Sequence, residues 1–219
     1  MNNINKYVEH TLLKPDATKL ELDKLLLEAK ENEFLGVCVN PINVSYAKEF
    51  LKNTDIKIVT VIGFPLGANC TEIKAKEAEL AVLDGADEID MVINISALKD
   101  NNDEFVLQDI AQVVKASGEK PVKVIIETDL LTKDEIKRAS HITAKAGAKF
   151  IKTSTGFVKT GVGAKVEDVE VMSAIAKEYG IQVKASGGIK TFEDAVKLVN
   201  AGASRLGTSS GVQIIQGAK

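Results

Sequence analysis

Short runs of β-branched and other apolar residues alternate along the chain with longer segments rich in Ala, Leu, Lys and Glu. The short runs predict buried strands at residues 7–13, 36–40, 57–62, 88–94, 122–127, 148–152, 181–184 and 204–207. Between them, apolar residues recur at three- and four-residue spacing, which predicts amphipathic helices. Because parallel strands need crossover connections that are usually helical, this order predicts a parallel sheet with buried strands.

The predicted helices have recognisable ends. Three begin with a hydroxyl residue followed three positions later by a carboxylate, which is the capping-box pattern, at Thr18 with Glu21, Thr132 with Glu135 and Thr191 with Asp194. Four end at a glycine that precedes a predicted strand, at Gly85, Gly147, Gly180 and Gly202. Glycine suits the left-handed backbone position that closes a helix, so these residues mark the helix boundaries.

Seven or eight such β/α units in 219 residues predict an α/β fold, a (β/α)8 TIM barrel. The alternative is an open, doubly wound sheet. That fold usually carries a glycine-rich turn after its first strand, and this sequence has none there. No long linker and no low-complexity segment divides the sequence. We therefore interpret residues 1–219 as a single TIM-barrel domain.

The composition limits the classes of function. With 28 Lys and Arg residues against 31 Asp and Glu residues, the net charge is −3, which argues against bulk binding to nucleic acid. Apolar stretches are interrupted well before about 18 residues, so no membrane span is expected. The first residues lack the pattern of a secretion signal, so we expect Cys38 and Cys70 to be reduced thiols in a soluble, cytoplasmic protein. Two histidines and no CxxC or HExxH motif predict no metal site.

Ionisable residues embedded in apolar runs are the first candidates for chemistry, because catalytic groups of barrels lie at the C-terminal ends of the strands. They are Asp90 in IDMVIN, Lys152 in FIKTSTG and Lys184 in VKASGG. An unpaired ammonium group is costly to bury, so a buried lysine is usually paired or functional. Lys123 lies at the opposite end of its predicted strand, and we expect it to support the core.

Lys152 and Lys184 end successive predicted strands, and neighbouring strands lie about 4.8 Å apart. If both side chains point inward, the amines lie about 6 Å apart. They then repel each other by about 2.8 kcal/mol at an effective dielectric constant near 20, which equals about two pKa units. One amine would be largely neutral near physiological pH and able to form a Schiff base, with Asp90 transferring protons. The alternative is that each lysine is solvated or simply paired with Asp90. The pattern does not choose which lysine reacts.

The turns after the last three predicted strands are small and rich in hydroxyl groups and backbone N–H donors. They are residues 153–156, 186–189 and 207–211. In many barrels a phosphate group binds to the loops after the last two strands, at the start of a short helix, and Ser209 could begin such a helix. The pattern predicts a phosphate site. The alternative is tight turns followed by an ordinary capped helix.

Seven motifs occur in order along nearly the whole sequence: HTLLKP at 10–15, VCVNP at 37–41, TVIGFPLG at 60–67, EIDMVIN at 88–94, KVIIET at 123–128, FIKTSTG at 150–156 and VKASGG at 183–188. With these motifs the chain resembles the deoxyribose-phosphate aldolase family, whose members are class I aldolases on a (β/α)8 barrel. The resemblance implies a lyase that reversibly cleaves 2-deoxy-D-ribose 5-phosphate into acetaldehyde and D-glyceraldehyde 3-phosphate, in deoxynucleoside breakdown.

Matched residue by residue, the resemblance implies a role for each candidate. Lys152 would be the Schiff-base lysine, Lys184 the second lysine that lowers the pKa of its neighbour and donates a proton, and Asp90 a proton relay with an ordered water. The phosphate contacts would be Thr155, Gly187, Gly188, Gly207, Ser209 and Ser210, largely through backbone N–H groups. No metal and no organic cofactor is implied. The partner would be a small phosphosugar, with no nucleic acid and no membrane, and a homodimer is compatible with this interpretation.

The sequence departs from the family pattern at three places. Glu9 stands before the His-Thr pair, where family members often have Asp. Phe157 stands where some members place a lysine for the phosphate, and Lys159 or Lys190 could compensate. Some longer members end in a tail whose terminal Tyr assists proton transfer. This sequence ends in Gln-Gly-Ala-Lys219, so we do not expect that assistance here.

Two other functions remain open at this point. One is a different Schiff-base aldolase or a transaldolase on the same barrel, which would prefer a ketose phosphate. The other is a barrel that binds a phosphosugar without catalysis, in which borohydride and acetaldehyde would label no lysine.

Overall fold

The strands follow one another in chain order around a closed, parallel barrel in the computed structural model, which describes residues 3–218. They are β1 (Val8–Leu12), β2 (Gly36–Val39), β3 (Lys57–Ile62), β4 (Glu88–Val92), β5 (Val122–Ile125), β6 (Phe150–Lys152), β7 (Gln182–Ser186) and β8 (Arg205–Thr208). β1 pairs with both β2 and β8, which closes the sheet. The predicted (β/α)8 barrel is confirmed, and the open-sheet alternative is wrong. The terminal residue Lys219 lies outside the described residues.

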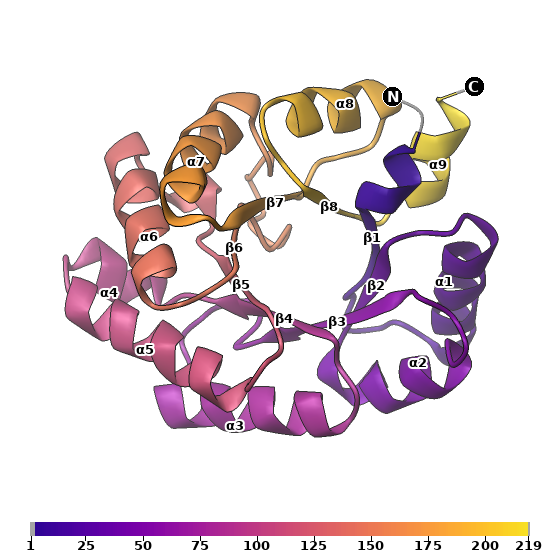
Figure 1. Cartoon of the computed structure of the whole chain (residues 1–219), viewed down its shortest axis with the longest axis horizontal. Helices are drawn as coiled ribbons and strands as arrows, with labels where there is room; N and C mark the ends of the chain where they lie inside the picture. The colour runs from indigo at the N-terminus through magenta and orange to yellow at the C-terminus, as the bar shows by residue number, and fades with distance from the viewer. Residues whose placement is uncertain (1–2, 219) are drawn as a thin grey trace.

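The helices form a ring around the barrel (Figure 1). They are α1 (Lys19–Glu31), α2 (Val44–Phe50), α3 (Thr71–Leu83), α4 (Ile95–Lys99), α5 (Asp103–Ala116), α6 (Lys133–Lys145), α7 (Val166–Tyr179), α8 (Phe192–Asn200) and α9 (Gly211–Gln216). Three short 3₁₀ helices, η1 (Ile4–Tyr7), η2 (Pro41–Asn43) and η3 (Thr128–Leu130), occupy connections. Within residues 3–218, no helix is both long enough and apolar enough to cross a lipid bilayer.

The helix ends form as the sequence predicts. All three capping boxes are present, with the hydroxyl groups of Thr18, Thr132 and Thr191 each accepting the backbone N–H three residues on. The four predicted glycines after helices α3, α6, α7 and α8 all have positive φ angles. Local hydrogen bonds therefore set where these helices start and stop.

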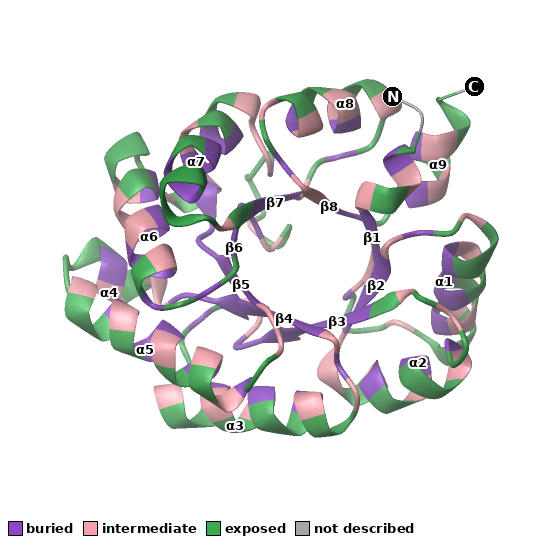
Figure 2. Ribbon diagram, in the orientation of Figure 1, coloured by how far each residue is buried: buried purple, intermediate pink, exposed green. Residues whose placement is uncertain are grey.

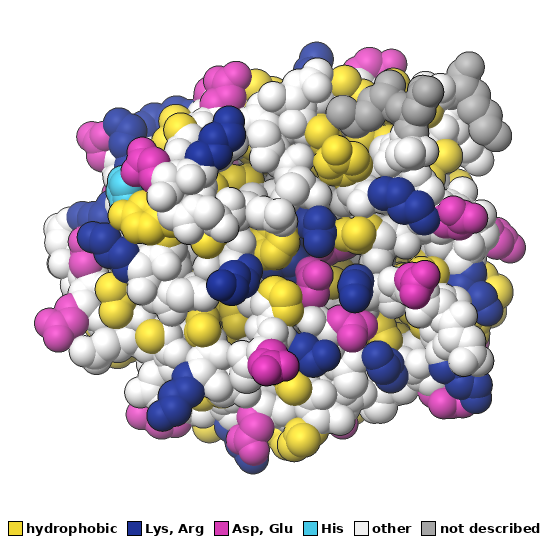
Figure 3. Space-filling model, in the orientation of Figure 1, with side chains coloured by type: hydrophobic (Ala, Val, Ile, Leu, Met, Phe, Trp, Pro, Cys, Tyr) yellow, Lys and Arg dark blue, Asp and Glu magenta, His cyan; other side chains and the backbone are white. Residues whose placement is uncertain are grey.

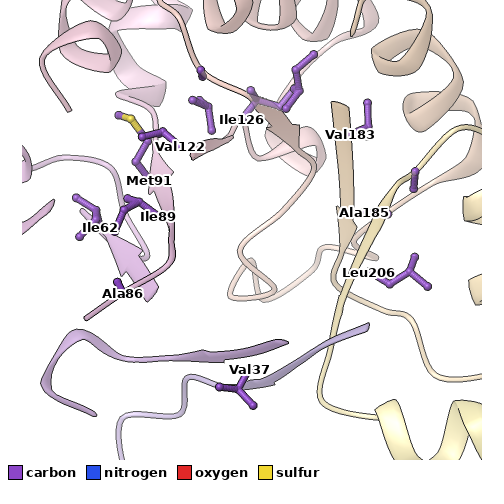
Figure 4. Packing of buried hydrophobic residues seen from close by; sticks show 14 of the residues in the cluster. Val37, Ile62, Ala86, Ile89, Met91, Val122, Ile126, Val183, Ala185 and Leu206 are labelled. Carbon is purple, nitrogen blue, oxygen red and sulfur yellow. The ribbon is translucent and has the colours of Figure 1, made fainter. Parts of the chain in front are cut away.

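The main hydrophobic core lies between the barrel and the helices. Successive residues of a strand point to opposite faces, so each strand sends one set of side chains outward and the other into the barrel. Figure 4 shows Ile89 and Met91 of β4 and Val183 and Ala185 of β7 within this outer layer. The strands are largely buried, and exposed residues lie on the outer surfaces of the helices and in the loops (Figure 2). This layer fixes the strand register, and with it the residues that face the interior.

The interior of the barrel has an apolar side and a charged side. Cys38 of β2 and Val59 and Val61 of β3 form a small buried cluster with Leu13. The remaining strands place carboxylates and lysines in the interior, which are described below. Charged groups at the molecular surface are mixed: on the face drawn in Figure 3, Lys and Arg side chains are interspersed with Asp and Glu.

The predicted bounds of every strand except β3 shift by one or two residues, and the shifts at the ends of β5 and β7 affect the candidate site. β5 stops at Ile125, because Glu127 adopts a left-handed backbone conformation with φ 60°. β7 continues to Ser186, so Lys184 lies in the middle of its strand and not at the end. Lys152 does end β6 as predicted.

Gly67, in the connection between β3 and α3, has no room for a side chain. Its φ is 69°, and a Cβ atom there would lie 1.9 Å from the carbonyl oxygen of Ile93. Gly118 also has a positive φ, 59°, but a Cβ atom there would meet nothing within 4 Å. A side chain at Gly67 would cause both backbone strain and steric overlap, whereas one at Gly118 would cause backbone strain alone.

We expect Gly67→Ala to lower the free energy of unfolding by about 3 kcal/mol, because strain and overlap add. Gly118→Ala should cost about 1 kcal/mol, from strain alone. Urea denaturation of both variants measures the difference. Equal losses would show that the backbone near Ile93 moves away freely.

Candidate active site

Asp90 of β4 lies at the centre of a buried group of three lysines. Its Oδ2 atom accepts hydrogen bonds from Lys152 Nζ at 2.7 Å and from Lys184 Nζ at 2.6 Å. Its Oδ1 atom accepts one from Lys123 Nζ at 2.9 Å. The carboxylate therefore joins the two candidate lysines and a third lysine that the sequence analysis assigned to core support.

The register of the sheet produces this arrangement. Lys152 pairs with Lys184 across β6 and β7, and Asp90 pairs with Lys123 across β4 and β5. Because side chains alternate along a strand, all four point into the barrel once their apolar neighbours point outward. The three candidate residues from different parts of the sequence thus meet through strand pairing.

A second carboxylate, Glu9 of β1, completes the buried network. It accepts a hydrogen bond from Lys184. One of its oxygens also lies 3.5 Å from Lys123 Nζ and 3.6 Å from Arg205 Nε. Lys123 contacts Glu88 as well, at 2.7 Å. Lys184 is therefore held between Asp90 and Glu9.

Sequence reasoning did not assign Glu9 to the site and misplaced Lys123. Glu9 was noted only as a departure from a family pattern, and Lys123 was set aside because it lies early in its strand. Yet both are ionisable residues inside apolar runs, which is the criterion that selected Asp90. Both are fully buried. Lys123 lies early in β5, but the sheet register places it beside Asp90 of β4. Its position in the strand therefore did not exclude contact with Asp90.

The pKa values of the two candidate lysines shift in opposite directions. Burial lowers the pKa of Lys152, and repulsion from Lys184 lowers it further, against the attraction of Asp90. Burial also acts to lower the pKa of Lys184, but Asp90 and Glu9 together raise it above its ordinary value. The sequence argument attributed the neutral amine to repulsion between lysines. The structure puts desolvation first and identifies Lys152 as the more easily deprotonated of the two.

The carboxylates remain charged. Burial by itself would raise the pKa of Asp90, yet the three ammonium groups around it hold that pKa well below its ordinary value. The pKa of Glu9 is lowered in the same way by Lys123 and Lys184. The interior thus holds fixed negative charge beside an amine of low basicity.

An open pocket of about 450 Å³ lies above this network. Lys152 lines it, whereas Asp90 and Lys184 are not among its lining residues. All six predicted phosphate contacts line it: Thr155, Gly187, Gly188, Gly207, Ser209 and Ser210. Lys14, Phe157 and Lys190 also contribute to the wall, and Lys159 does not. The loops after β6, β7, β8 and β1 therefore surround the Lys152 amine, and α9 follows Ser210 as the predicted short helix.

Close packing requires a glycine at position 188 and leaves little room for a side chain at position 207. A Cβ atom on Gly207 would lie 3.0 Å from Lys184 Cε. Gly188 has a φ of 73°, and a Cβ atom there would lie 2.2 Å from the carbonyl oxygen of Val162. Side chains at these positions would displace either the second lysine or the neighbouring loop.

Thr155 lines the pocket, but its own donors are engaged elsewhere. Its backbone N–H lies 3.2 and 3.3 Å from the two carboxylate oxygens of Glu127, and its hydroxyl donates to the same carboxylate. In this state Thr155 shapes the wall and offers neither donor to a phosphate.

Among residues 3–218, no group of three or more His, Cys, Asp and Glu side chains is arranged to hold a metal ion.

Comparisons with known proteins find aldolases by family model, by sequence and by structure. A model of the DeoC/LacD family of aldolases matches residues 6–217. The chain is 57% identical over 212 residues to the deoxyribose-phosphate aldolase of Staphylococcus carnosus, covering 97% of this chain and 95% of that protein. It is 54% identical over 217 residues to the deoxyribose-phosphate aldolase of Streptococcus suis, covering 99% of this chain and 97% of that protein. The tetrameric deoxyribose phosphate aldolase of Aeropyrum pernix is 33% identical, with a TM-score of 0.90 over 98% of this chain and 90% of that one.

We expect Asp90→Asn to lower the free energy of unfolding at pH 7 by about 3–5 kcal/mol, because it leaves the buried ammonium group of Lys152 without its carboxylate and takes one partner from Lys123 and Lys184. The pKa of Asp90 is lower in the folded than in the unfolded chain. Its contribution is therefore present above about pH 4 and is lost as the pH falls toward the folded value. The variant should lose less stability than the wild type on acidification.

Urea denaturation at pH 7 and at a series of values below pH 5 measures both effects. Asp134→Asn is the matched control, since the side chain of Asp134 is 93% exposed and forms an ion pair with Lys137 on the same helix. It should change stability by less than about 0.5 kcal/mol. A loss at Asp90→Asn no larger than this control would contradict the central role of the carboxylate.

Proposed function

Because the chain belongs to the DeoC/LacD family of aldolases, we propose that it reversibly cleaves 2-deoxy-D-ribose 5-phosphate into acetaldehyde and D-glyceraldehyde 3-phosphate through a Schiff base. The observation that carries the mechanism is Lys152. It is a buried lysine of lowered pKa that lines the pocket and contacts a charged carboxylate at 2.7 Å. A lowered pKa increases the neutral, nucleophilic fraction of the amine.

In the direction of cleavage, the neutral amine of Lys152 attacks the aldehyde carbon C1 of the open-chain sugar. The carbinolamine loses water and gives an iminium ion. Removal of the proton from the 3-hydroxyl then breaks the C2–C3 bond, and the electron pair moves into an enamine with the iminium nitrogen as electron sink. D-glyceraldehyde 3-phosphate leaves, C2 is protonated, and hydrolysis releases acetaldehyde and restores Lys152.

Asp90 and Lys184 supply proton transfer and charge balance in this scheme. Asp90 hydrogen-bonds Lys152 directly, so it is placed to exchange protons with the carbinolamine, directly or through water. Lys184 stays protonated between Asp90 and Glu9, so its positive charge favours the neutral form of Lys152. The roles assigned to the two lysines follow from their opposite pKa shifts.

The phosphate group would bind on the loops after β7 and β8, at the side of the pocket away from the buried charged network. Gly187, Gly188, Ser209 and Ser210 line the pocket there. Backbone N–H groups of such turns suit an anion, although that of Ser210 donates to the Thr208 hydroxyl at 2.9 Å in this structure. Lys14 and Lys190 add positive charge at the same wall. They would take the place of the lysine that is absent at Phe157.

The proposal extends to the setting of the enzyme. It would act in the breakdown of deoxynucleosides, in the cytoplasm, on a small phosphosugar and without a metal or an organic cofactor. A homodimer stays the prediction for its assembly, and the relative from Aeropyrum pernix is a tetramer.

Borohydride reduction in the presence of acetaldehyde tests the Schiff base. We expect a two-carbon adduct on the peptide that contains Lys152, because the reduced imine is stable to digestion and mass analysis. Lys152→Arg keeps the positive charge but cannot form the imine, so it should remain unlabelled and inactive. An unlabelled wild-type protein would contradict the proposed chemistry, and a preference for a ketose phosphate over the 2-deoxy aldose would contradict the proposed substrate.

Lys184→Leu tests the electrostatic coupling. Removing the positive charge should raise the pKa of Lys152 and lower turnover at pH 7 by up to about a hundredfold, which corresponds to two pKa units. Activity should partly recover in alkaline solution, as the amine of Lys152 loses its proton. A pH–rate profile measures both effects, and Lys145→Leu, an exposed lysine on α6, is the control. Full activity of Lys184→Leu at pH 7 would refute the coupling.

A further inference from the structure

Two carboxylates in the turn after β5 hold the loop between β6 and α7, which forms one wall of the pocket. From these contacts we propose that Glu127 and Asp129 are positioning residues for the phosphate-binding end of the site. Neither lines the pocket, so each acts through the backbone of the residues that do. We call this pair the carboxylate clasp. The inference rests on the proposed function, because it concerns how this pocket holds a phosphorylated substrate.

Glu127 holds the near end of the loop. Its side chain is buried, and it accepts both the backbone N–H and the hydroxyl of Thr155. The Thr155 hydroxyl oxygen in turn accepts the backbone N–H of Phe157 at 3.0 Å. One carboxylate thereby fixes Thr155, Gly156 and Phe157, three consecutive residues of the pocket wall.

The backbone of Glu127 supports this interpretation. Its φ of 60° is a left-handed conformation that costs a residue other than glycine about 1–2 kcal/mol. Such a conformation persists where the surrounding contacts determine it, and it occurs often at functional sites. Here the left-handed turn follows the end of β5 at Ile125, two residues before the predicted end of the strand. The Glu127 carboxylate then contacts Thr155 in the next loop.

Asp129 holds the far end of the same loop. Its Oδ2 accepts the backbone N–H of Gly163 at 2.8 Å, and its Oδ1 lies 3.4 Å from Lys165 Nζ. A side chain on Gly161 would meet the Asp129 carboxylate, since a Cβ atom there would lie 2.5 Å from Oδ2. The loop thus passes closely over this carboxylate.

The segment held by Asp129 supports the glycine pair of the next loop. Ala164 N–H donates to the carbonyl oxygen of Gly187 at 3.1 Å. A Cβ atom on Gly163 would lie 2.3 Å from the carbonyl of Gly187, and one on Gly188 would lie 2.2 Å from the carbonyl oxygen of Val162. Displacement of residues 162–164 would therefore move Gly187 and Gly188 as well. The clasp thus holds the loop after β6 directly and the loop after β7, with Gly187 and Gly188, through it. The positive charge of Lys152 acts on the Glu127 carboxylate and tends to lower its pKa. A change in that charge acts on the amine end of the site, which both substrates share.

The experiment compares a phosphorylated with an unphosphorylated substrate. For each variant, kcat/KM is measured on 2-deoxyribose 5-phosphate and on 2-deoxyribose, and the ratio of the two values reports the use of the phosphate group. We expect Glu127→Ala and Asp129→Ala to lower this ratio about tenfold or more, because misplacement of binding groups by a fraction of an ångström is costly. A variant that only unfolds part of the protein lowers both values equally and leaves the ratio unchanged.

Conservative variants and a control sharpen the test. Asp129→Asn and Glu127→Gln keep an acceptor oxygen for the Gly163 and Thr155 N–H groups, so they should restore most of the ratio. Glu135→Ala removes a carboxylate of the same β/α unit that caps α6 away from the pocket, and it should leave the ratio unchanged. If the alanine variants do not fold, Glu127→Asp retracts the carboxylate from Thr155 without removing its charge and should lower the ratio in the same way.

Binding of inorganic phosphate, followed by calorimetry, separates this inference from the proposed function. The clasp predicts weaker phosphate binding by the alanine variants than by the wild type, whether or not the protein cleaves the sugar. A wild type that forms no adduct and cleaves no deoxyribose phosphate would refute the proposed function. An active wild type, with an unchanged substrate ratio and unchanged phosphate affinity in all clasp variants, would refute the inference alone.

Discussion

The carboxylate of Asp90 is fully buried with three ammonium nitrogens at 2.6, 2.7 and 2.9 Å. An interior charge is tolerated only when it is paired and hydrogen-bonded, and here each group depends on the others for its pairing. Neutralising the carboxylate would take away the ion-pair partner of Lys152 and leave Lys123 and Lys184 to Glu88 and Glu9. This constraint keeps Lys184 charged and places Lys152 against a fixed negative charge, and the rest of the site is built around it.

The division of labour between the two lysines follows from their surroundings. Lys184 forms ion pairs with two carboxylates, Asp90 and Glu9. Lys152 forms an ion pair with Asp90 and lines the pocket. Desolvation acts on both amines, so the number of nearby negative charges decides which one loses its proton more easily. In the proposed mechanism, that difference separates the nucleophile, Lys152, from the lysine that stays charged, Lys184.

The two ends of the pocket are supported by different parts of the molecule. The amine end depends on strand pairing in the barrel, which is rigid because its outward side chains are packed beneath the helices. The end of the pocket proposed for the phosphate consists of loops, and loops need their own anchors. Glu127 and Asp129 anchor one of these loops from the turn after β5, and through Gly163 that loop supports Gly187 and Gly188. Reaction chemistry and substrate binding thus have separate structural supports in the same barrel.

Periodicity, capping residues and glycines in the sequence were enough to predict the barrel, its strands and its helix ends, because those signals are local. The run IDMVIN likewise marked Asp90, and the motifs around Lys152 and Lys184 marked the two lysines. Which groups touch was decided only by the closed sheet, since register brings Glu9 of β1 beside Lys184 of β7, 175 residues apart in the sequence. The family resemblance already implied Lys152 as the reactive lysine, but a physical reason for preferring it to Lys184 required the tertiary structure, because a pKa depends on burial and on every charge nearby. The left-handed turn at Glu127 was not apparent in the run KVIIET, because it is stabilised by contacts with a loop that follows the next strand.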